Sequence, residues 1–240
     1  MIKATYQKYI LDFKQASGTS RGVLTQKETW FLILEKDNKK GIGECGILRG
    51  LSIDDRPNYE EKLQWICQNI HLGKQKLYDD LTEFPSIQFG VEMAFLSLES
   101  ENPLELFPSE FTENNESIDI NGLVWMGEPS YMKEQIEQKI AENFTCIKLK
   151  IGAIDFNKEL ELLQFIRTHF DAKTIEIRVD ANGGFSPEEA LSKLNQLHKF
   201  DLHSIEQPIR QHQIAEMKKL CQETPFPIAL DEELIGVFTY

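Results

Sequence analysis

The chain has 240 residues, with 39 acidic and 26 basic side chains and a formal net charge of −13. This length allows one large domain or two smaller ones, each with a buried core. The negative charge makes nucleic acid and anionic membranes poor partners on electrostatic grounds. The N-terminus lacks the apolar stretch of a signal peptide, and no apolar run approaches the length that spans a membrane.

The four cysteines are widely scattered, and no two of them have CxxC spacing; they are Cys45, Cys67, Cys146 and Cys221. This spacing indicates neither a zinc site nor a disulfide framework. We therefore predict a reduced, cytoplasmic protein.

The first part of the chain is expected to form strands followed by helices. The expected elements are strands at 2–11 and 28–35, a strand from the polar turn at 36–41 to about Cys45, and helices at 57–71 and 89–98. Strands followed by helices are typical of an α+β domain. Because residues 107–117 are polar and acidic, we place a domain boundary there, between domains 1–112 and 113–240.

Residues 41–46, Gly-Ile-Gly-Glu-Cys-Gly, match the dinucleotide-binding pattern GxGxxG literally. That pattern requires a preceding strand and a helix that begins within it. Here the first glycine belongs to a hairpin turn, and the following residues 49–52 do not begin a helix. We reject a nucleotide-binding role for this stretch.

The second part of the chain alternates strands and helices with a short repeat. Strands are expected at 118–124, 144–151, 174–180, 202–206 and 227–231, and helices at 130–142, 157–170, 186–199 and 211–221. This alternation is typical of parallel βαβ units with right-handed crossovers. The predicted fold class is therefore α/β, with a TIM-type (β/α) barrel in this part.

Four charged residues stand at or near the predicted ends of successive strands: Lys150, Asp180, Glu206 and Asp231. They are separated by 30, 26 and 25 residues, and each interval is one βα unit. In a TIM barrel the carboxyl ends of the strands form the catalytic face. We therefore expect the three carboxylates to converge there.

Converging carboxylates repel one another and must be neutralised. For any one of them, capping the next helix or pairing with Arg178 or a lysine is the simpler interpretation. Three acids at the same structural phase favour a hard divalent cation, and Mg²⁺ accepts carboxylate ligands while it keeps sites for substrate oxygens. We therefore predict that Asp180, Glu206 and Asp231 bind Mg²⁺.

Lys148 and Lys150 share one face of their predicted strand, because side chains alternate along a strand. An edge strand with solvated lysines would explain them alone. Beside the carboxylates, however, a lysine is a candidate base for removing a substrate α-proton. A second ammonium about 6 Å away costs about 2.8 kcal/mol at an effective dielectric near 20, so Lys148 lowers the pKa of Lys150 while the carboxylates act in the opposite direction.

The set Lys148-x-Lys150, Asp180-x-Asn182, Glu206-x-Pro208 and Asp231-Glu232 resembles the enolase superfamily, in its muconate-lactonizing subgroup. Sites of that superfamily use a lysine or histidine base with Mg²⁺. The resemblance covers nearly the whole chain, and it implies that residues 1–112 are a capping domain. Three stretches, residues 17–22, 85–92 and 121–127, are most similar to o-succinylbenzoate synthases.

This resemblance implies a lyase that makes o-succinylbenzoate for menaquinone biosynthesis by syn-dehydration through an enediolate. Lys150 would remove the α-proton and then assist loss of hydroxide, and Lys148 would tune Lys150 and the enediolate charge. The residues implied in binding a small-molecule carboxylate substrate are Arg21, Ser20 and Asn182. The first two lie in the stretch at 17–22, which is small and polar and is either a plain turn or a mobile loop that closes over an anion.

The family also leads us to expect a lysine on strand six, opposite Lys150, followed by strands six to eight. The chain ends at Tyr240, after the fifth predicted strand, so we expect a barrel truncated there and a fragment of a longer protein. A dipeptide epimerase or N-acylamino-acid racemase is an alternative function, but two-base chemistry needs the opposing lysine. A non-catalytic, metal-binding fragment is a further alternative. The oligomeric state is left open.

Overall fold

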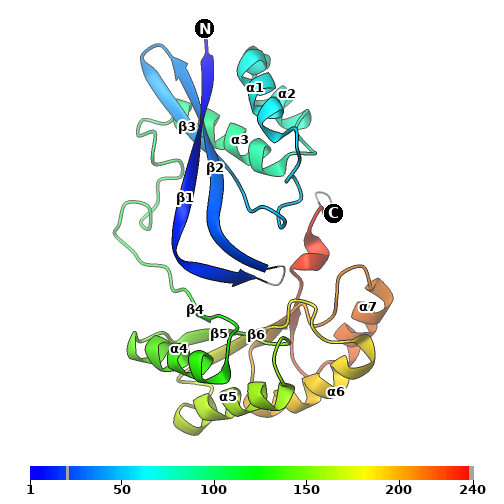
Figure 1. Cartoon of the computed structure of the whole chain (residues 1–240). Coiled ribbons are helices and arrows are strands. Elements are labelled where there is room, and N and C mark those ends of the chain that lie inside the picture. Colours follow the sequence, from blue (N-terminus) through cyan, green and yellow to red (C-terminus); the bar gives the residue numbers. More distant parts are fainter. Residues whose placement is uncertain (20–21, 238–240) are drawn as a thin grey trace. The chain divides into compact units, whose positions relative to one another are not determined.

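The computed structural model describes residues 1–19 and 22–237, in two compact units, Met1–Ile118 and Asp119–Tyr240 (Figure 1). The division between the units falls six residues after the expected boundary between 112 and 113. Ser20 and Arg21, the expected substrate-binding pair, lie outside the described residues.

The first unit contains an antiparallel sheet of three strands in the order β1-β2-β3. These are β1 (Lys3–Thr19), β2 (Gly22–Lys36) and β3 (Lys39–Ile47). All four described residues of the expected loop at 17–22 lie in strands, since Ser17 pairs with Leu24 and Thr19 with Gly22 after a register shift that follows Asp12. The hydrogen bonds between two strands join backbone groups, so small polar residues can extend a strand although their sequence shows no apolar alternation.

The helices of the first unit follow the sheet in the chain. They are α1 (Tyr59–Asn69), the 3₁₀ helix η1 (Ile70–Leu72), α2 (Lys74–Asp79) and α3 (Pro85–Glu99). The short α2 was not predicted, and α3 begins four residues before the expected start at 89. The buried Asp54 explains this earlier start, because its Oδ2 accepts hydrogen bonds from the backbone N–H of Ser86 at 2.9 Å and from the Ser86 hydroxyl at 2.6 Å.

The glycines of the rejected GxGxxG pattern serve helix–sheet packing. A Cβ added to Gly41 would lie 2.2 Å from the carbonyl oxygen of Ala94 on α3, and one added to Gly43 would lie 1.8 Å from that of Gly90. A Cβ on Gly90 would in turn lie 2.2 Å from Sγ of Cys45. Only glycine allows this close approach of α3 to β3. The stretch therefore lies in β3, against a helix.

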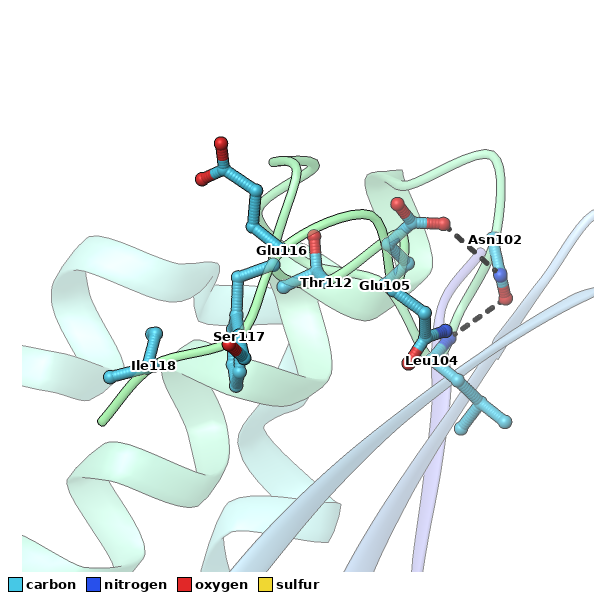
Figure 2. A pocket seen from close by; sticks show the side chains of 9 residues that line it. Asn102, Leu104, Glu105, Thr112, Glu116, Ser117 and Ile118 are labelled. Atoms are coloured by element: carbon cyan, nitrogen blue, oxygen red, sulfur yellow. Dashed lines mark hydrogen bonds between the residues drawn. The ribbon is translucent and has the colours of Figure 1, made fainter. Parts of the chain in front are cut away.

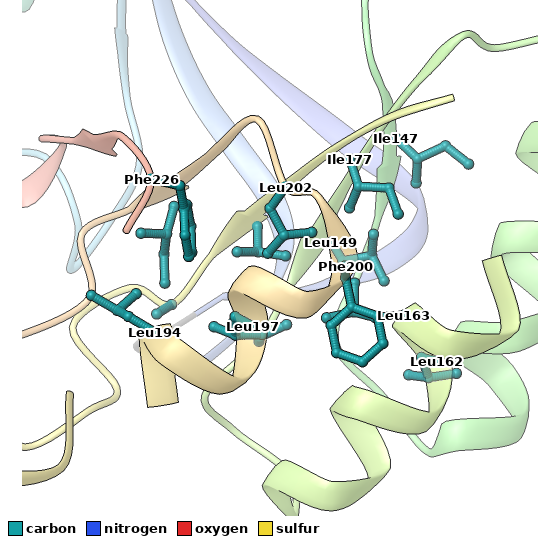
Figure 3. Close-up of a cluster of buried hydrophobic side chains, with 14 of the residues drawn as sticks. Ile147, Leu149, Leu162, Leu163, Ile177, Leu194, Leu197, Phe200, Leu202 and Phe226 are labelled. Carbon is teal, nitrogen blue, oxygen red and sulfur yellow. The ribbon is translucent and has the colours of Figure 1, made fainter. Parts of the chain in front are cut away.

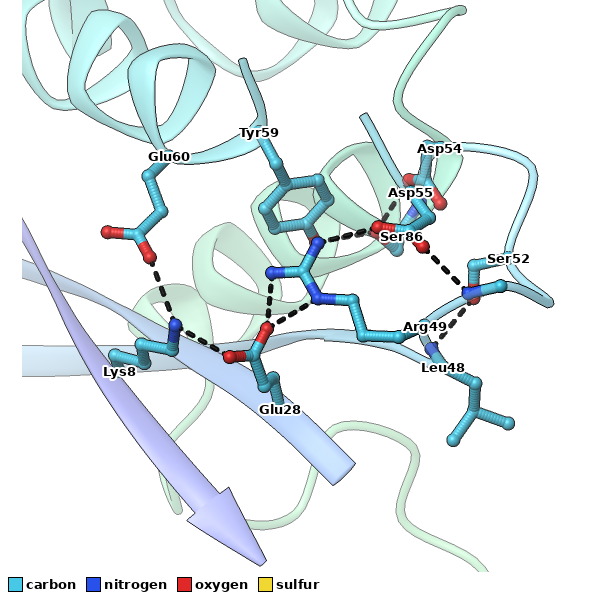
Figure 4. A network of polar contacts seen from close by, with 11 residues as sticks. Lys8, Glu28, Leu48, Arg49, Ser52, Asp54, Asp55, Tyr59, Glu60 and Ser86 are labelled. Atoms are coloured by element: carbon cyan, nitrogen blue, oxygen red, sulfur yellow. Dashed lines mark hydrogen bonds and ion pairs between the residues drawn. The ribbon is translucent and has the colours of Figure 1, made fainter. Parts of the chain in front are cut away.

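A network of charged side chains stands on the surface of the first unit (Figure 4). Glu28 accepts hydrogen bonds from Lys8 at 2.8 Å and from Nε of Arg49 at 2.6 Å. Arg49 also donates to Asp55 at 2.6 Å, and Lys8 donates to Glu60 at 3.3 Å. Glu28 thus lies between two cations.

This network should make the stability of the first unit depend on pH. The hydrogen bond from Lys8, with those from Arg49, holds the pKa of Glu28 below its ordinary value of 4.5 although burial opposes this. Ionised Glu28 therefore contributes stability above about pH 4.5, and this contribution is lost as the pH falls through the lowered pKa. We expect Glu28→Gln to be less stable than wild type by about 1 kcal/mol at pH 7, and by clearly less at pH 3, in urea unfolding.

The exposed Glu61→Gln on α1 is the control for the Glu28 experiment and should stay within about 0.5 kcal/mol of wild type at both pH values. A stability difference for Glu28→Gln that is equal at pH 7 and pH 3 would show that the charge of Glu28 contributes nothing.

The second unit contains a parallel sheet of five strands in chain order, β4-β5-β6-β7-β8. These are β4 (Gly122–Val124), β5 (Cys146–Lys150), β6 (Glu176–Asp180), β7 (Ser204–Glu206) and β8 (Ile228–Ala229). The connecting helices are α4 (Pro129–Ala141), α5 (Phe156–His169), α6 (Pro187–Leu197) and α7 (Ile214–Glu223). Two 3₁₀ helices, η2 (His198–Phe200) and η3 (Glu232–Leu234), complete the unit. The predicted β/α alternation is confirmed.

Local signals explain where the helices of the second unit begin. Asp155 caps α5, since its side chain accepts hydrogen bonds from the backbone N–H groups of Asn157 and Lys158. Ser186 and Glu189 form a reciprocal capping box at the start of α6.

None of the helices in the described part of the chain is long and apolar enough to cross a membrane.

One face of the parallel sheet shares an apolar core with the helices (Figure 3). The strands contribute alternate residues such as Ile147, Leu149 and Ile177, and α5 and α6 contribute residues such as Leu163 and Leu194. The predicted alternation is confirmed, since the apolar side of each strand meets the helices.

Ile177 lies at the centre of this core and is 0% exposed. We expect Ile177→Ala to lower the free energy of unfolding by about 3 kcal/mol, because it leaves a cavity that the surrounding side chains cannot fill. Ile214→Ala on α7 is the matched control, because Ile214 is 70% exposed and its truncation should cost less than about 0.5 kcal/mol. Chemical denaturation measures both changes, and equal losses in the two variants would contradict this description of the core.

Candidate active site at the strand ends

The register of the sheet brings the predicted site residues to one level. Lys150 pairs with Asp180 across β5 and β6, and Asp180 pairs with Glu206 across β6 and β7. Glu206 pairs with Ala229 on β8, so Asp231 lies two residues beyond that level, after the strand has ended. Lys150, Asp180 and Glu206 therefore stand side by side at the carboxyl end of the sheet.

Lys148 and Lys150 point away from the apolar core. Their side chains are 21% and 18% exposed, whereas Ile147 and Leu149 between and beside them are buried. The interpretation as an edge strand with solvated lysines is wrong, because β5 lies between β4 and β6. Both ammonium groups are thus partly withdrawn from solvent.

The two lysines and two carboxylates form a compact charged cluster. The fully buried Asp180 accepts a hydrogen bond from the ammonium of Lys150. Nζ of Lys148 lies 2.5 Å from Oε2 of Glu206 and 3.5 Å from Oδ2 of Asp180. An ammonium group therefore stands between two carboxylates, and the two positive charges balance the two negative ones.

Contacts within this cluster shift the pKa values of Lys148 and Glu206. Burial lowers the pKa of Lys148, whereas the hydrogen bond to Glu206 and the charges of Asp180 and Glu206 raise it. The raising effects are larger together, so the net pKa shift is upward. Burial raises the pKa of Glu206, and although Lys148 opposes this, the charge of Asp180 adds to it. The surrounding carboxylates thus favour the charged form of Lys148.

Asn182 links Lys150 to the segment that follows β8. Its backbone N–H donates to Oδ1 of Asp180 at 2.9 Å, and its side-chain Oδ1 accepts from Nζ of Lys150 at 3.0 Å. Its Nδ2 donates to Oε1 of Glu232, also at 3.0 Å. Asn182 was expected to bind substrate, but in this structure its amide contacts the lysine and a second acid.

Gln207, which the sequence analysis missed, anchors the segment that carries Asp231. The side chain of Gln207 is fully buried, and its Oε1 accepts from the backbone N–H groups of Asp231 at 3.1 Å and of Glu233 at 3.2 Å. Its Nε2 donates to the carbonyl oxygen of Ile209 at 3.0 Å. The only sequence signal was its place between Glu206 and Pro208.

Glu159, also missed, fixes the loop that follows Lys150. Glu159 is 1% exposed, and its Oε1 accepts from the backbone N–H of Gly152 at 2.6 Å. Gly152 has a φ of +88°, and a Cβ added there would lie 3.1 Å from the carbonyl oxygen of Ala181. The loop after β5 therefore packs tightly on the loop that carries Asn182.

The structure brings two of the three expected carboxylates to one level of the sheet. Within residues 1–19 and 22–237, no three histidine, cysteine or acidic side chains form a group that could hold a metal ion. Asp180 and Glu206 come together, but Asp231 is exposed because it lies beyond the end of β8. The oxygen donors still suit a hard cation such as Mg²⁺, and Asp180 and Glu206 already hold a positive charge, the Lys148 ammonium, between them.

Comparison with known proteins shows the family to which the chain belongs. The family model described as "MenC, N-terminal domain" matches residues 1–98, and "Enolase C-terminal domain-like" matches residues 131–240. The o-succinylbenzoate synthase of Desulfotalea psychrophila is 44% identical over 98% of this chain and 73% of its own length. The chain belongs to the o-succinylbenzoate synthase family.

Solved structures agree with this family assignment. The crystal structure of MenC from Desulfotalea psychrophila superposes with a TM-score of 0.84 and 39% identity, over 99% of this chain and 73% of that one. An o-succinylbenzoate synthase from Thermosynechococcus elongatus, "complexed with MG in the active site", shares the fold with a TM-score of 0.75 and 22% identity, over 96% of this chain and 68% of that one. A curated L-Ala-D/L-Glu epimerase of Francisella tularensis matches over 103 residues at 34% identity, 42% of this chain and 28% of its own length.

Membership of the o-succinylbenzoate synthase family confirms the predicted enzyme class. The protein is a carbon–oxygen lyase, and the epimerases of the same superfamily are more distant relatives. The predicted α/β fold with an α+β N-terminal part is confirmed as well.

The first unit contains a hollow of about 560 Å³ (Figure 2). It is lined by the irregular segment 102–118, with apolar groups such as Leu104 and Phe111 beside polar ones such as Asn102. It includes none of the charged residues at the strand ends, and we assign it no part in catalysis.

Proposed function

We propose that the protein makes o-succinylbenzoate for menaquinone biosynthesis by a Mg²⁺-dependent syn-dehydration. One observation carries the proposal. In a chain 44% identical to an o-succinylbenzoate synthase, the ammonium of Lys150 stands against Asp180 and Asn182 at the carboxyl end of a parallel sheet. This is the face on which barrel enzymes place their catalytic groups.

Lys150 is proposed as the acid–base group. As a free amine it takes the substrate proton on the carbon next to a carboxylate, which leaves an enediolate. As the resulting ammonium it returns that proton to the hydroxide that departs from the same face, so that the net change is loss of one water. Asp180 and Asn182 hold the ammonium form through hydrogen bonds.

Lys148 is proposed to act as a fixed cation. A lysine is ordinarily protonated at neutral pH, and the ammonium of Lys148 lies beside Glu206 and Asp180. A positive charge that is already in place stabilises the enediolate without reorganisation.

Asp180, Glu206 and Asp231 are the residues that we propose would hold Mg²⁺. Bound there, the cation would stabilise the second negative charge that develops on the substrate carboxylate when the α-proton leaves. Gln207 supports this proposal for Asp231, because it fixes the backbone of that residue next to β7.

The proposed partner is a small-molecule carboxylate, with no nucleic acid and no membrane. Arg21 and Ser20 remain the predicted contacts for a distal carboxylate of the substrate. The four cysteines are free thiols, which supports our proposal that the protein works in the reducing cytoplasm.

The test is turnover of the hydrated precursor, which is o-succinylbenzoate plus one water. We expect product formation in Mg²⁺, its loss on addition of EDTA, and its return when Mg²⁺ is added in excess. Turnover that is indifferent to EDTA would refute the metal dependence. Mg²⁺ binding without any turnover would favour a non-catalytic, metal-binding protein.

A further inference from the structure

We infer that Glu232 is a positioning residue, which orients the side-chain amide of Asn182 so that its carbonyl oxygen faces Lys150. The inference rests on the proposed function of Lys150 as the acid–base group. It concerns a residue that contacts neither Lys150 nor the lysine's carboxylate partner, and that acts through Asn182.

The polarity of the contacts carries this inference. Lys150 Nζ can only donate and a carboxylate can only accept, so an amide between them satisfies both in one orientation alone. In that orientation Oδ1 of Asn182 lies 3.0 Å from the ammonium and Nδ2 lies 3.0 Å from Oε1 of Glu232. Rotation of the amide by a half turn would set its N–H groups against the ammonium and its oxygen against the carboxylate.

Glu232 is itself held where it can do this. It opens η3, and its neighbours Asp231 and Glu233 donate their backbone N–H groups to the buried Gln207. Oε2 of Glu232 is shielded from solvent and accepts no hydrogen bond from the described residues. Oε2 is thus buried without a partner at some cost, and Oε1 is directed to Asn182.

The backbone of Asn182 fixes the position of the amide, and Lys150 and Glu232 together set its rotation. The residue has a φ of +44°, and its N–H is bound to Oδ1 of Asp180 at 2.9 Å. Nothing in these backbone contacts distinguishes the two amide orientations. Loss of the Glu232 acceptor would therefore leave the amide of Asn182 oriented by Lys150 alone, and the hydrogen bond between Asn182 and Lys150 would weaken.

The first experiment measures the exposure of the Lys150 amine directly. We propose to label the full chain with acetic anhydride in EDTA and to measure acetylation of Lys150 by peptide mass spectrometry, relative to Lys158, whose side chain is 51% exposed. Glu232→Met should raise the relative rate about fivefold, the value of one ordinary hydrogen bond. Glu232→Gln, which keeps an oxygen acceptor, should stay within twofold of wild type.

Two controls test that the effect passes through Asn182. Glu233→Met makes the same chemical change at the neighbouring residue, whose Oε1 accepts from His212 N–H, and it should leave Lys150 labelling unchanged. In an Asn182→Leu background, Glu232→Met should have no further effect. If Glu232→Met does not fold, as judged by its melting curve, Glu232→Ala takes its place. Labelling within twofold of wild type, or an equal rise in Glu232→Gln, would overturn the inference.

A second experiment separates this inference from the proposed function. With Mg²⁺ and the hydrated precursor, Glu232→Met should lower kcat about tenfold, leave KM within twofold, and be rescued in Glu232→Gln. If wild type shows no turnover while the labelling pattern holds, the proposed function fails and the positioning role stands. If wild type turns over and labelling is unaffected by Glu232→Met, the positioning role fails alone.

Discussion

Replacement of Lys150 by methionine is expected to lower kcat for dehydration by about a thousandfold or more. Methionine keeps most of the aliphatic stem but has no proton to accept or return, and general acid–base groups contribute rate factors of this size. The variant should still bind substrate, because Lys148, Glu206 and Asp180 remain in place. Steady-state kinetics with excess Mg²⁺ measures the change, and we expect KM to move far less than kcat.

The control for Lys150→Met is Lys158→Met on α5. Lys158 is half-exposed and pairs with Glu161 at 2.9 Å, away from the strand ends. Its replacement should leave melting temperature and turnover near wild type. Lys150→Met with a kcat within tenfold of wild type would exclude Lys150 as the acid–base group.

Replacement of Asp180 by asparagine is the second change with a large expected effect. Asp180 is fully buried, and it accepts hydrogen bonds from the Lys150 ammonium and from the backbone N–H of Asn182. It also lies 3.5 Å from Nζ of Lys148. Asparagine preserves its size and one acceptor oxygen but removes its charge. We expect Mg²⁺ affinity to fall by about a hundredfold or more in isothermal titration calorimetry, with a parallel loss of turnover.

Glu161→Gln is the matched control for Asp180→Asn, because it also removes one carboxylate charge but lies exposed on α5. It should bind Mg²⁺ as wild type does. Unchanged Mg²⁺ affinity in Asp180→Asn would mean that the cation, if bound, is held elsewhere, and the proposed ligand set would be wrong.

The alternation of strands and helices in the second unit could be predicted from the sequence because hydrophobic period and capping residues agree there. Ile177 and Val179 mark the buried side of β6, and Ser186 with Glu189 marks the start of α6. The spacing of Lys150, Asp180 and Glu206 then follows from the geometry of parallel strands, which sets successive strand ends at one edge.

Other features could not be predicted because they depend on contacts between distant residues. Gln207 and Glu159 interrupt no pattern in the sequence, yet each is buried and fixes backbone N–H groups of a neighbouring loop. The pairing of Lys148 with Glu206 was considered only as a general alternative to metal binding. The continuation of β1 to Thr19 was hidden by small polar side chains, since backbone pairing leaves no trace in composition.

The measurement that tests the central claim most directly compares two reactions on one preparation. It determines kcat/KM in Mg²⁺ for dehydration of the hydrated precursor and for epimerisation of L-Ala-L-Glu, a dipeptide of the kind that the related epimerases are named for. We predict that dehydration exceeds epimerisation by at least about a hundredfold, a free-energy difference of about 2.7 kcal/mol. Epimerisation that is as fast as dehydration, or faster, would contradict the assignment of this site to o-succinylbenzoate synthesis.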